Sequence, residues 1–197
     1  MNLLFLDTET TGLPDWHKPS DAPQQPHVIQ AAAILTDAEG NELDVWNTII
    51  QPGPGARMEP EALKAHGISL DRAMAEGVPL AEAWERFIGL IGRAEGVVGH
   101  NVSFDIRIMR IAGARATGRK WECPLPNRCT MRMSTPVVRI PPTERMLAAG
   151  FTKFKNPNLT ECVRFFFNED HSGAHDALAD VRASKRVYFA LKERLAQ

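Results

Sequence analysis

The amino-acid sequence predicts an α/β fold in which a mixed β-sheet carries helices on both faces. Three observations lead to this expectation. The chain begins with three consecutive strand-like runs, later strand-like runs alternate with helical patterns, and 197 residues of 44% hydrophobic composition suit one substantial core rather than two. We therefore expect a single domain over residues 1–197.

The first three strands are predicted from apolar runs. Leu3 to Leu6 is continuous, which suits a strand buried on both faces, and it delivers Asp7 at its end. Residues 28–35 and 43–50 give two further strands, joined by the turn-like residues 37–41. Three consecutive strands with a short turn indicate an antiparallel meander.

The middle of the chain alternates between helix and strand. Residues 79–91 and 102–116 place apolar side chains at helical spacing. Between them, residues 96–99 form a short apolar run that predicts a buried strand. Residues 120–157 are rich in proline and arginine and lack a clear period, so we place only one further strand there, near 128–133.

The last forty residues predict two helices, about 158–167 and 176–195, separated by the polar segment 168–173. The start of the chain has only four apolar residues in a row before a carboxylate, which matches neither a signal peptide nor a membrane span. We therefore expect a cytoplasmic protein with no membrane partner.

The three cysteines lie far apart and match no C-x-x-C pattern, which argues against both a disulfide scaffold and a zinc site. The net charge of −1 hides an asymmetry. Residues 106–155 hold eleven Lys/Arg against two acidic residues, whereas residues 1–105 hold six against sixteen. Segments of opposite sign suggest a surface for polyanions beside carboxylates that need cations, although ordinary solvated faces would give the same composition.

Asp7 and Glu9 form the first candidate site. Alternate side chains of a strand point the same way, so both carboxylates face one spot, about 6–7 Å apart along the chain. The same pattern occurs on exposed strand edges without any function. Here it follows an apolar run and precedes a glycine turn, which favours a cation site.

Two further acids, Asp105 and Asp180, each lie near the start of a predicted helix and each follow a histidine by five positions. Asn101 is the expected N-cap of the helix after residue 101, which brings His100 beside Asp105. If Asp176 caps the last helix, His175 is placed next to Asp180 in the same way. Acids in a first turn also favour the helix dipole without any other role.

Four acids from separate elements would repel one another unless cations bind between them. Oxygen-only ligation suits Mg²⁺ or Mn²⁺ rather than zinc. Two such ions about 4 Å apart can clamp the attacking and leaving oxygens of a phosphodiester. A nearby histidine of near-neutral pKa can take the proton from the attacking water, but the spacing leaves His100 and His175 equivalent.

Three motifs in order resemble those of the DEDDh-type 3′-5′ exonuclease family, over nearly the whole chain. They are Asp7-Thr8-Glu9-Thr10-Thr11-Gly12, His100-Asn101-x-x-Phe104-Asp105 and His175-x4-Asp180. The resemblance implies a single RNase H-like domain with a five-stranded mixed sheet. It also implies two metal ions held by the four acids, and nucleoside 5′-monophosphate products.

The resemblance further implies individual roles. Asp7 would bridge the two ions, Glu9 would hold one ion and orient the attacking water, and Asp180 would be a direct ligand. Asp105 would bind directly or through water. Only the resemblance selects His175 as the general base.

Other residues are implied as substrate contacts. Residues 10–12 (Thr10, Thr11 and Gly12) fall where backbone amides of the family meet the terminal 3′-hydroxyl, and Leu13 falls where an apolar side chain wedges against the terminal base. His66 resembles a residue of a loop that contacts the terminal nucleotide. His100 and Asn101 are expected to support substrate handling.

Residues 14–27 are expected to form a mobile loop near the active site, because the segment is long and rich in proline and polar residues. Trp16 on this loop would stack on a base or pack against its own loop. Residues 106–155 are expected to supply phosphate contacts, with Arg128, Arg132 and Arg139 as candidates.

The expected function is removal of nucleotides from single-stranded or frayed DNA 3′ ends, and RNA 3′-end trimming is the alternative. A nucleic-acid-binding module without turnover is disfavoured because all five expected catalytic residues are present. We expect any polymerase or replication partner to bind a surface of this domain itself.

Overall fold

The computed structural model describes residues 1–195, and residues 196–197 of the predicted domain lie outside the described part. One five-stranded sheet has the order β3-β2-β1-β4-β5. Its strands are β1 (Leu3–Thr10), β2 (Val28–Thr36), β3 (Glu42–Ile49), β4 (Gly96–Gly99) and β5 (Asn127–Cys129). The first three strands pair antiparallel, whereas β4 runs parallel to β1 and β5 runs parallel to β4, so the predicted mixed sheet and meander are confirmed.

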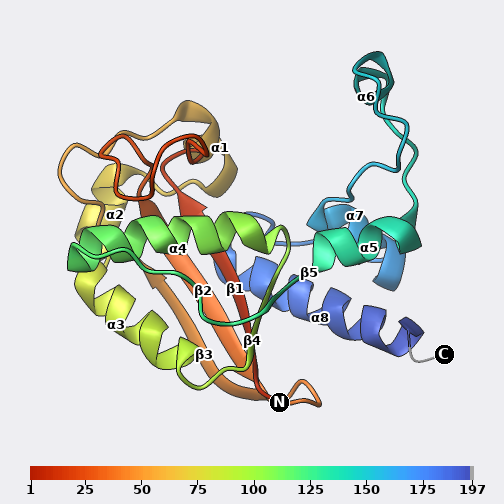
Figure 1. Ribbon diagram of the computed structural model, residues 1–197, viewed down its shortest axis with the longest axis horizontal. Coiled ribbons are helices and arrows are strands. Elements are labelled where there is room, and N and C mark those ends of the chain that lie inside the picture. The colour runs from red at the N-terminus through yellow and green to blue at the C-terminus, as the bar shows by residue number, and fades with distance from the viewer. Residues whose placement is uncertain (196–197) are drawn as a thin grey trace.

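Eight helices complete the described chain (Figure 1). They are α1 (Pro60–His66), α2 (Leu70–Glu76), α3 (Leu80–Ile91), α4 (Val102–Thr117), α5 (Thr130–Val138), α6 (Glu144–Ala148), α7 (Leu159–Phe167) and α8 (Ala177–Leu195). Within residues 1–195, no helix is long and apolar enough to cross a membrane.

Strand β1 lies at the centre of the sheet and packs on both sides. Leu4 and Leu6 belong to the core shared with α3 and α4, whereas Leu3 and Phe5 belong to the core shared with α8. Helices therefore cover both faces of the sheet, as predicted, and continuous burial explains why this strand lacks the polar alternation of a half-exposed one.

The predicted strand near residues 128–133 is wrong in its second half. The strand ends at Cys129 and α5 begins at Thr130. The two buried positions of this helix are the polar residues Thr130 and Ser134, and Pro136 lies inside it. Only Met133 and Val137 pack against a core from this helix, and one such pair is too short a pattern to indicate a helix.

Helices α1, α2 and α6 were also not predicted, and the reason is similar. Helices α1 and α6 bury no residue, and α2 buries only Ala73. A helix without a buried face leaves no periodic apolar signal. The three cysteines are free, in agreement with the sequence analysis.

Candidate active site

Strand β1 presents Asp7 and Glu9 on the face that α8 covers, because they continue the alternation of Leu3 and Phe5. Thr8, between them, points to the other face and donates a hydrogen bond from its hydroxyl to Asp105 Oδ1, at 2.9 Å. The pairing register shifts between Glu9 and Thr10, and β1 ends at Thr10, one residue after the second acid.

Helix α4 supplies Asp105, whose side chain is buried. Asn101 is the N-cap residue of α4, as predicted, but its backbone is left-handed with φ of 68° and its side chain makes no cap hydrogen bond. Capping through the side chain needs an extended backbone, which this turn does not allow. Asparagine tolerates the left-handed region better than most residues.

The predicted approach of His100 to Asp105 is also wrong. The two ring nitrogens of His100 lie 3.0 Å from Thr130 Oγ1 and 3.0 Å from the carbonyl oxygen of Pro157. The left-handed turn at Asn101 replaces the extended cap that the predicted contact required. His100 therefore joins the end of β4 to the start of α5 and to the segment before α7.

Helix α8 supplies Asp180 one turn from its start. Asp176 Oδ1 accepts a hydrogen bond from the Ala179 amide at 3.0 Å, which confirms the predicted cap. The His175 amide donates to Asp180 Oδ2 at 3.1 Å. One ligand atom from each of Glu9, His175 and Asp180 can be chosen so that all three lie within 4.8 Å of one another. The predicted proximity of His175 to Asp180 is thus present.

Sequence reasoning missed His171. Its Nε2 contacts Asp180 Oδ1, and its side chain is only 6% exposed. The residue lies in the polar segment that was treated as a connection between helices, where neither an apolar period nor a recognised motif marks it. Gln30 was not among the predicted site residues either, yet its Nε2 donates to Asp176 Oδ2 at 3.2 Å and links β2 to the start of α8.

The acids repel one another at this site. Burial, followed by the charges of Asp105, Asp180 and Glu9, raises the pKa of Asp7 well above its usual range. Burial and the same kind of repulsion raise the pKa of Glu9 to about 8. Burial raises the pKa of Asp105 to about 7, although the hydrogen bond from Thr8 acts in the opposite direction.

The donor set fits divalent cations. Within residues 1–195, none of the four carboxylates forms an ion pair with a lysine or arginine, and only Asp180 contacts a histidine ring, that of His171. Carboxylate oxygens are the ligands that Mg²⁺ and Mn²⁺ prefer. A cation between them would restore the ionised forms that burial disfavours.

A cleft of about 650 Å³ opens beside the acids. Its lining includes Glu9 and His175 together with five of the predicted substrate contacts, which are Thr10, Gly12, Leu13, His66 and Asn101. Leu13 is 77% exposed at this cleft. Phe104 lines the cleft and also packs against the main core.

Two predicted substrate contacts do not line this cleft. Thr11 is buried, its amide donates to the His27 carbonyl at 2.8 Å, and its hydroxyl accepts from the His27 amide at 2.9 Å. His100 is engaged with Thr130 and Pro157, as described above. His66 lines the cleft but also contacts the Thr10 carbonyl through Nε2 at 3.1 Å.

Residues 14–27 follow the cleft residue Leu13 and are tied to α4. Arg107 donates to Ser20 Oγ at 2.8 Å, and Arg115 donates to the Pro26 carbonyl at 2.5 Å. The Arg107 guanidinium also lies 5.9 Å from the ring centre of Trp16, which remains 58% exposed. The predicted mobility of this loop stays a prediction.

Comparison with known proteins agrees with this architecture. The sequence model of the exonuclease family RNase_T matches residues 4–188, so the chain belongs to this family of exonucleases. The predicted family and enzyme class are confirmed. Members of the family depend on divalent metal ions.

Individual relatives match nearly the whole chain, one in sequence and others in structure. Ribonuclease T of Actinobacillus pleuropneumoniae serotype 5b (strain L20) is 24% identical over 204 residues, which cover 98% of this chain and 84% of the relative. E. coli Exonuclease I in complex with a dA16 oligonucleotide has a TM-score of 0.75 at 23% identity, over 99% of this chain and 41% of that chain.

A moderately thermophilic Exonuclease I from Methylocaldum szegediense has a TM-score of 0.72 at 25% identity, over 100% of this chain and 41% of that chain. The chain thus spans about two fifths of the length of these Exonuclease I structures. The likeness to the Exonuclease I structures confirms the predicted RNase H-like fold.

Proposed function

We propose that this protein is a 3′-5′ exonuclease that releases nucleoside 5′-monophosphates one at a time from single-stranded or frayed DNA 3′ ends. The observation that carries the proposal is the convergence of four carboxylates, from β1, α4 and α8, with His175 at the edge of one cleft. Membership of an exonuclease family supports the reaction class. The structural likeness to Exonuclease I, which was solved with dA16, supports DNA as the substrate.

Asp7, Glu9, Asp105 and Asp180 would hold two Mg²⁺ or Mn²⁺ ions. When bound, the ions supply the positive charge that stabilises the attacking and leaving oxygens of a phosphodiester. Two features of the chain support this assignment. The carboxylates form no ion pair with a lysine or arginine among the described residues, and the pKa values of Asp7, Glu9 and Asp105 are raised by burial and by neighbouring carboxylates.

His175 would accept the proton from the attacking water. Its ring lies at the cleft close to the carboxylates of Glu9 and Asp180, and no hydrogen bond of the ring occurs among the described residues. As the water oxygen bonds to phosphorus, the bond to the O3′ atom of the preceding nucleotide breaks, and that oxygen takes up a proton. Glu9 is close enough to His175 to orient the same water.

The other candidate histidine has a different environment. Both ring nitrogens of His100 already contact protein atoms, so neither is free to take a proton from water. Burial lowers the pKa of His100, while the Pro157 carbonyl and the carboxylates of Asp180 and Glu161 act in the opposite direction. These contacts favour His175 as the base and His100 as a support.

The cleft would receive the terminal nucleotide. Leu13 would pack against its base, because this leucine is exposed at the cleft rather than in the core. His66 and Asn101 line the same cleft and offer polar groups to the sugar and phosphate. Thr10 and Gly12 line it at the turn after β1.

The proposal is tested by digestion of a 5′-labelled single-stranded DNA oligonucleotide in Mg²⁺. We expect a ladder that shortens from the 3′ end, release of nucleoside 5′-monophosphates, and loss of both with EDTA. Asp7→Ala is expected to abolish turnover, and Asp37→Ala, at an exposed turn, is the matched control. If the Asp7→Ala protein digests the oligonucleotide at the wild-type rate, the proposed mechanism is refuted.

RNA is the second candidate substrate, because the chain is also similar to Ribonuclease T over 98% of its length. Digestion of DNA and RNA strands of the same sequence, in parallel, distinguishes the two. Faster shortening of the RNA strand would replace the DNA proposal with RNA 3′-end trimming. Stoichiometric binding of both strands without release of mononucleotides would instead indicate a binding module without turnover.

A further inference from the structure

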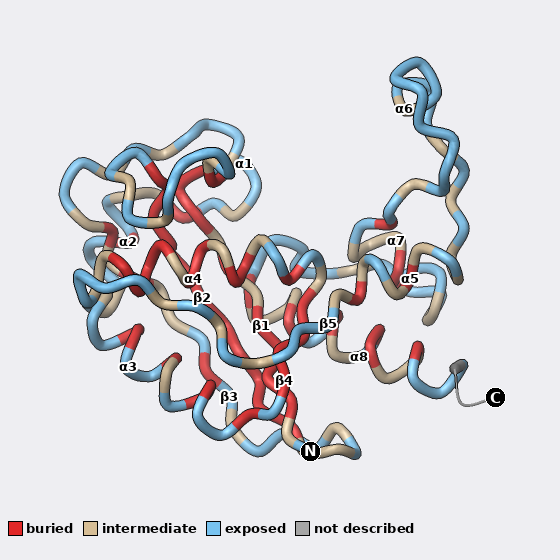
Figure 2. Tube along the Cα trace, in the orientation of Figure 1, coloured by how far each residue is buried: buried red, intermediate tan, exposed pale blue. Residues whose placement is uncertain are grey.

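Residues 139–156 form an arm that stands away from the rest of the molecule (Figure 1). The arm leaves the C-terminal end of α5, carries α6 near its tip and returns to α7. Its two sides meet at one isolated bridge, between Ile140 and Lys155. No residue of the arm is buried, as the pale blue trace in Figure 2 shows.

Apolar side chains lie exposed along this arm. Phe151 is 64% exposed, Leu147 52% and Phe154 45%. Three large apolar side chains on a segment without a core of its own mark an interaction surface rather than a packing requirement. Two of the three are aromatic rings, and exposed rings offer flat faces on which nucleic-acid bases stack.

The arm is also basic. It holds four Lys/Arg against one acidic residue, Glu144, for a net charge of +3. Only Lys155 is neutralised by a carboxylate, because its Nζ lies 2.6 Å from Glu161 Oε2. Within residues 1–195, Arg139, Arg145 and Lys153 form no ion pair.

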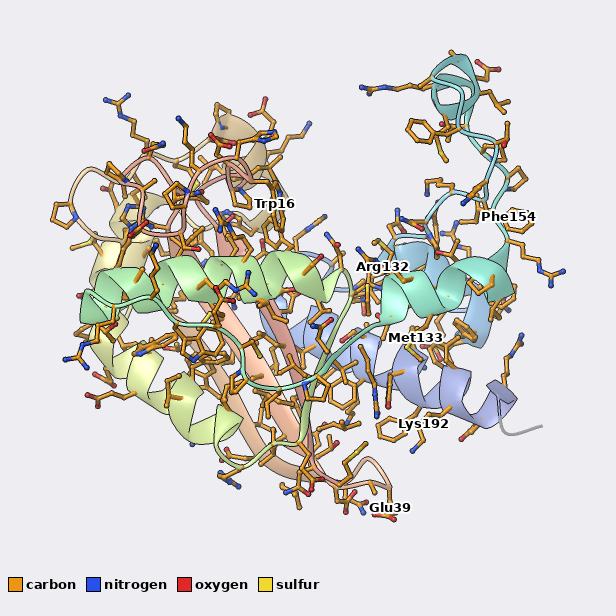
Figure 3. The ribbon with its side chains drawn as sticks, in the orientation of Figure 1. Trp16, Glu39, Arg132, Met133, Phe154 and Lys192 are labelled. Atoms are coloured by element: carbon orange, nitrogen blue, oxygen red, sulfur yellow. The ribbon has the colours of Figure 1, made fainter. Side chains whose placement is uncertain are left out.

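One aromatic ring and two cationic side chains lie together at the base of the arm. A cleft of about 530 Å³ lies between the arm and α5, and Arg132, Lys153 and Phe154 are among the residues that line it. Figure 3 shows Arg132 and Phe154 on the same side of the molecule, across from Trp16 on the loop of residues 14–27. A ring beside two unpaired cations suits a base and its flanking phosphates.

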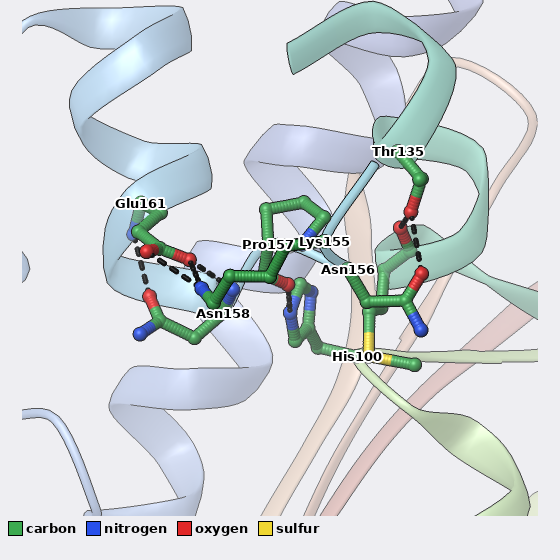
Figure 4. Close-up of polar contacts among 8 residues, drawn as sticks. His100, Thr135, Lys155, Asn156, Pro157, Asn158 and Glu161 are labelled. Carbon is green, nitrogen blue, oxygen red and sulfur yellow. Dashed lines mark hydrogen bonds and ion pairs between the residues drawn. The ribbon is translucent and has the colours of Figure 1, made fainter. Parts of the chain in front are cut away.

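The base of the arm is fixed next to the active site (Figure 4). The Pro157 carbonyl, just after the arm, contacts His100, and the neighbouring Asn101 lines the cleft that holds Glu9 and His175. On the same segment, Asn156 Oδ1 accepts a hydrogen bond from Thr135 of α5 at 2.9 Å. A strand whose 3′ end occupies the active-site cleft therefore has the arm close to its upstream nucleotides.

We propose that the arm, residues 139–156, binds the single-stranded nucleic acid upstream of the 3′ end, with Phe151 and Phe154 stacking on bases and Arg145 and Lys153 contacting phosphates. This inference rests on the proposed function and narrows the phosphate contacts predicted for residues 106–155. Arg128 lies outside the arm, and its guanidinium contacts Tyr188 Oη and lies over the Tyr188 ring.

Charge favours a nucleic acid over a second copy of the chain. Two arms of net charge +3 would repel each other. The phosphates of a nucleic-acid strand would instead neutralise both the arm and the cations of the cleft between the arm and α5. Self-association through the apolar residues is the competing explanation, and the experiment below separates the two.

The test uses two arm variants, Arg145→Glu/Lys153→Glu and Phe151→Ala/Phe154→Ala, in the full chain. Binding of a 5′-fluorescein-labelled 20-nucleotide strand is measured by anisotropy in EDTA, so that no hydrolysis occurs. We expect each variant to bind about tenfold more weakly at low salt. For the charge variant, the slope of log K against log salt concentration should become less negative by about 1.4, which corresponds to two lost phosphate contacts on a single strand.

Arg119→Glu/Lys120→Glu is the matched control. It makes the same change of charge within the basic segment, on an exposed loop that follows α4 at the end away from the arm. We expect wild-type affinity from the control. In Mg²⁺, the ratio of kcat/KM for the 20-nucleotide strand to that for a trinucleotide should fall about tenfold in the arm variants only.

Equal losses in the control and the arm variants, or no loss in either arm variant, would overturn the proposal. A wild-type dimer in light scattering that becomes a monomer in Phe151→Ala/Phe154→Ala, with unchanged strand affinity, would assign the arm to self-association instead. Failure of the proposed function is seen separately. A protein that binds the strand through the arm but never shortens it would refute the exonuclease and leave the arm assignment in place.

Discussion

Replacement of Asp105 by asparagine should stabilise the metal-free protein at pH 8. Burial raises the pKa of this carboxyl to about 7 from its ordinary 3.8, so the ionised form is disfavoured in the fold. The difference between the two values corresponds to about 4 kcal/mol at a pH above both. Asparagine has nearly the same shape, and its Oδ1 can still accept the hydrogen bond from Thr8. We expect the free energy of unfolding to rise by about 1 to 4 kcal/mol, because the new amide hydrogens offset part of the gain.

The sign of the effect depends on pH in a defined way. The folded-state pKa is raised, so the folded protein binds more protons than the unfolded chain between pH 3.8 and about 7. The penalty of the wild-type carboxyl is complete above pH 7, decreases as the pH falls, and disappears below 3.8. The advantage of Asp105→Asn should therefore shrink to less than about 2 kcal/mol at pH 5.

The assay is urea unfolding followed by tryptophan fluorescence, in EDTA, at pH 8 and pH 5. Asp37→Asn is the control, because hydrogen bonds from Asn41 and from nearby amides lower the pKa of Asp37, and no stabilisation is expected at pH 8. The reasoning fails if Asp105→Asn is less stable than the wild type at both pH values. It also fails if the difference between the two proteins is the same at pH 5 and pH 8.

Three further predictions concern the active site and the residues that support it. Mg²⁺ should raise the melting temperature of the wild type by binding the native state, and the Asp7→Ala/Asp180→Ala protein should not respond; equal shifts in a thermal scan would count against the metal site. His175→Ala should remove turnover by about 100-fold or more with little change in the Mg²⁺-induced thermal shift. His100→Ala should instead lower the free energy of unfolding by about 1 to 3 kcal/mol, because it leaves Thr130 and the Pro157 carbonyl without this hydrogen-bond partner. The two variants are compared by single-turnover rates and urea unfolding. A large loss of rate in His100→Ala and a large loss of stability in His175→Ala would exchange the two roles.

The sequence predicted the central part of this fold because burial there is strong and simple. Leu3 to Leu6 is buried on both faces, and such a run has few structural alternatives. The alternation of a strand then fixed the common direction of Asp7 and Glu9, and the cap at Asp176 fixed the start of α8. Strand alternation and helix capping depend on residues that are close together in the sequence, so both can be predicted from the sequence alone.

The parts that were not predicted depend on contacts between distant residues or on the absence of a buried face. His171 contacts Asp180, nine positions further along the chain, from the irregular segment that precedes α8, and no periodic pattern records such a contact. The arm of residues 139–156 buries nothing, so hydrophobic spacing cannot reveal it. Asn101 is a residue type that often caps helices through its side chain, but here its backbone is left-handed. The turn from β4 into α4 sets this backbone conformation.

Asp180 lies on the last helix, and that position affects when the chain becomes active during synthesis. A nascent chain that ends before α8 contains all five strands and three of the four carboxylates, yet it lacks the fourth acid and the helix that covers that face of β1. Under the proposed function, such a chain cannot complete its metal site. Under the proposed function, a nascent chain therefore stays inert towards the messenger RNA that encodes it until α8 has emerged from the ribosome and docked on the sheet.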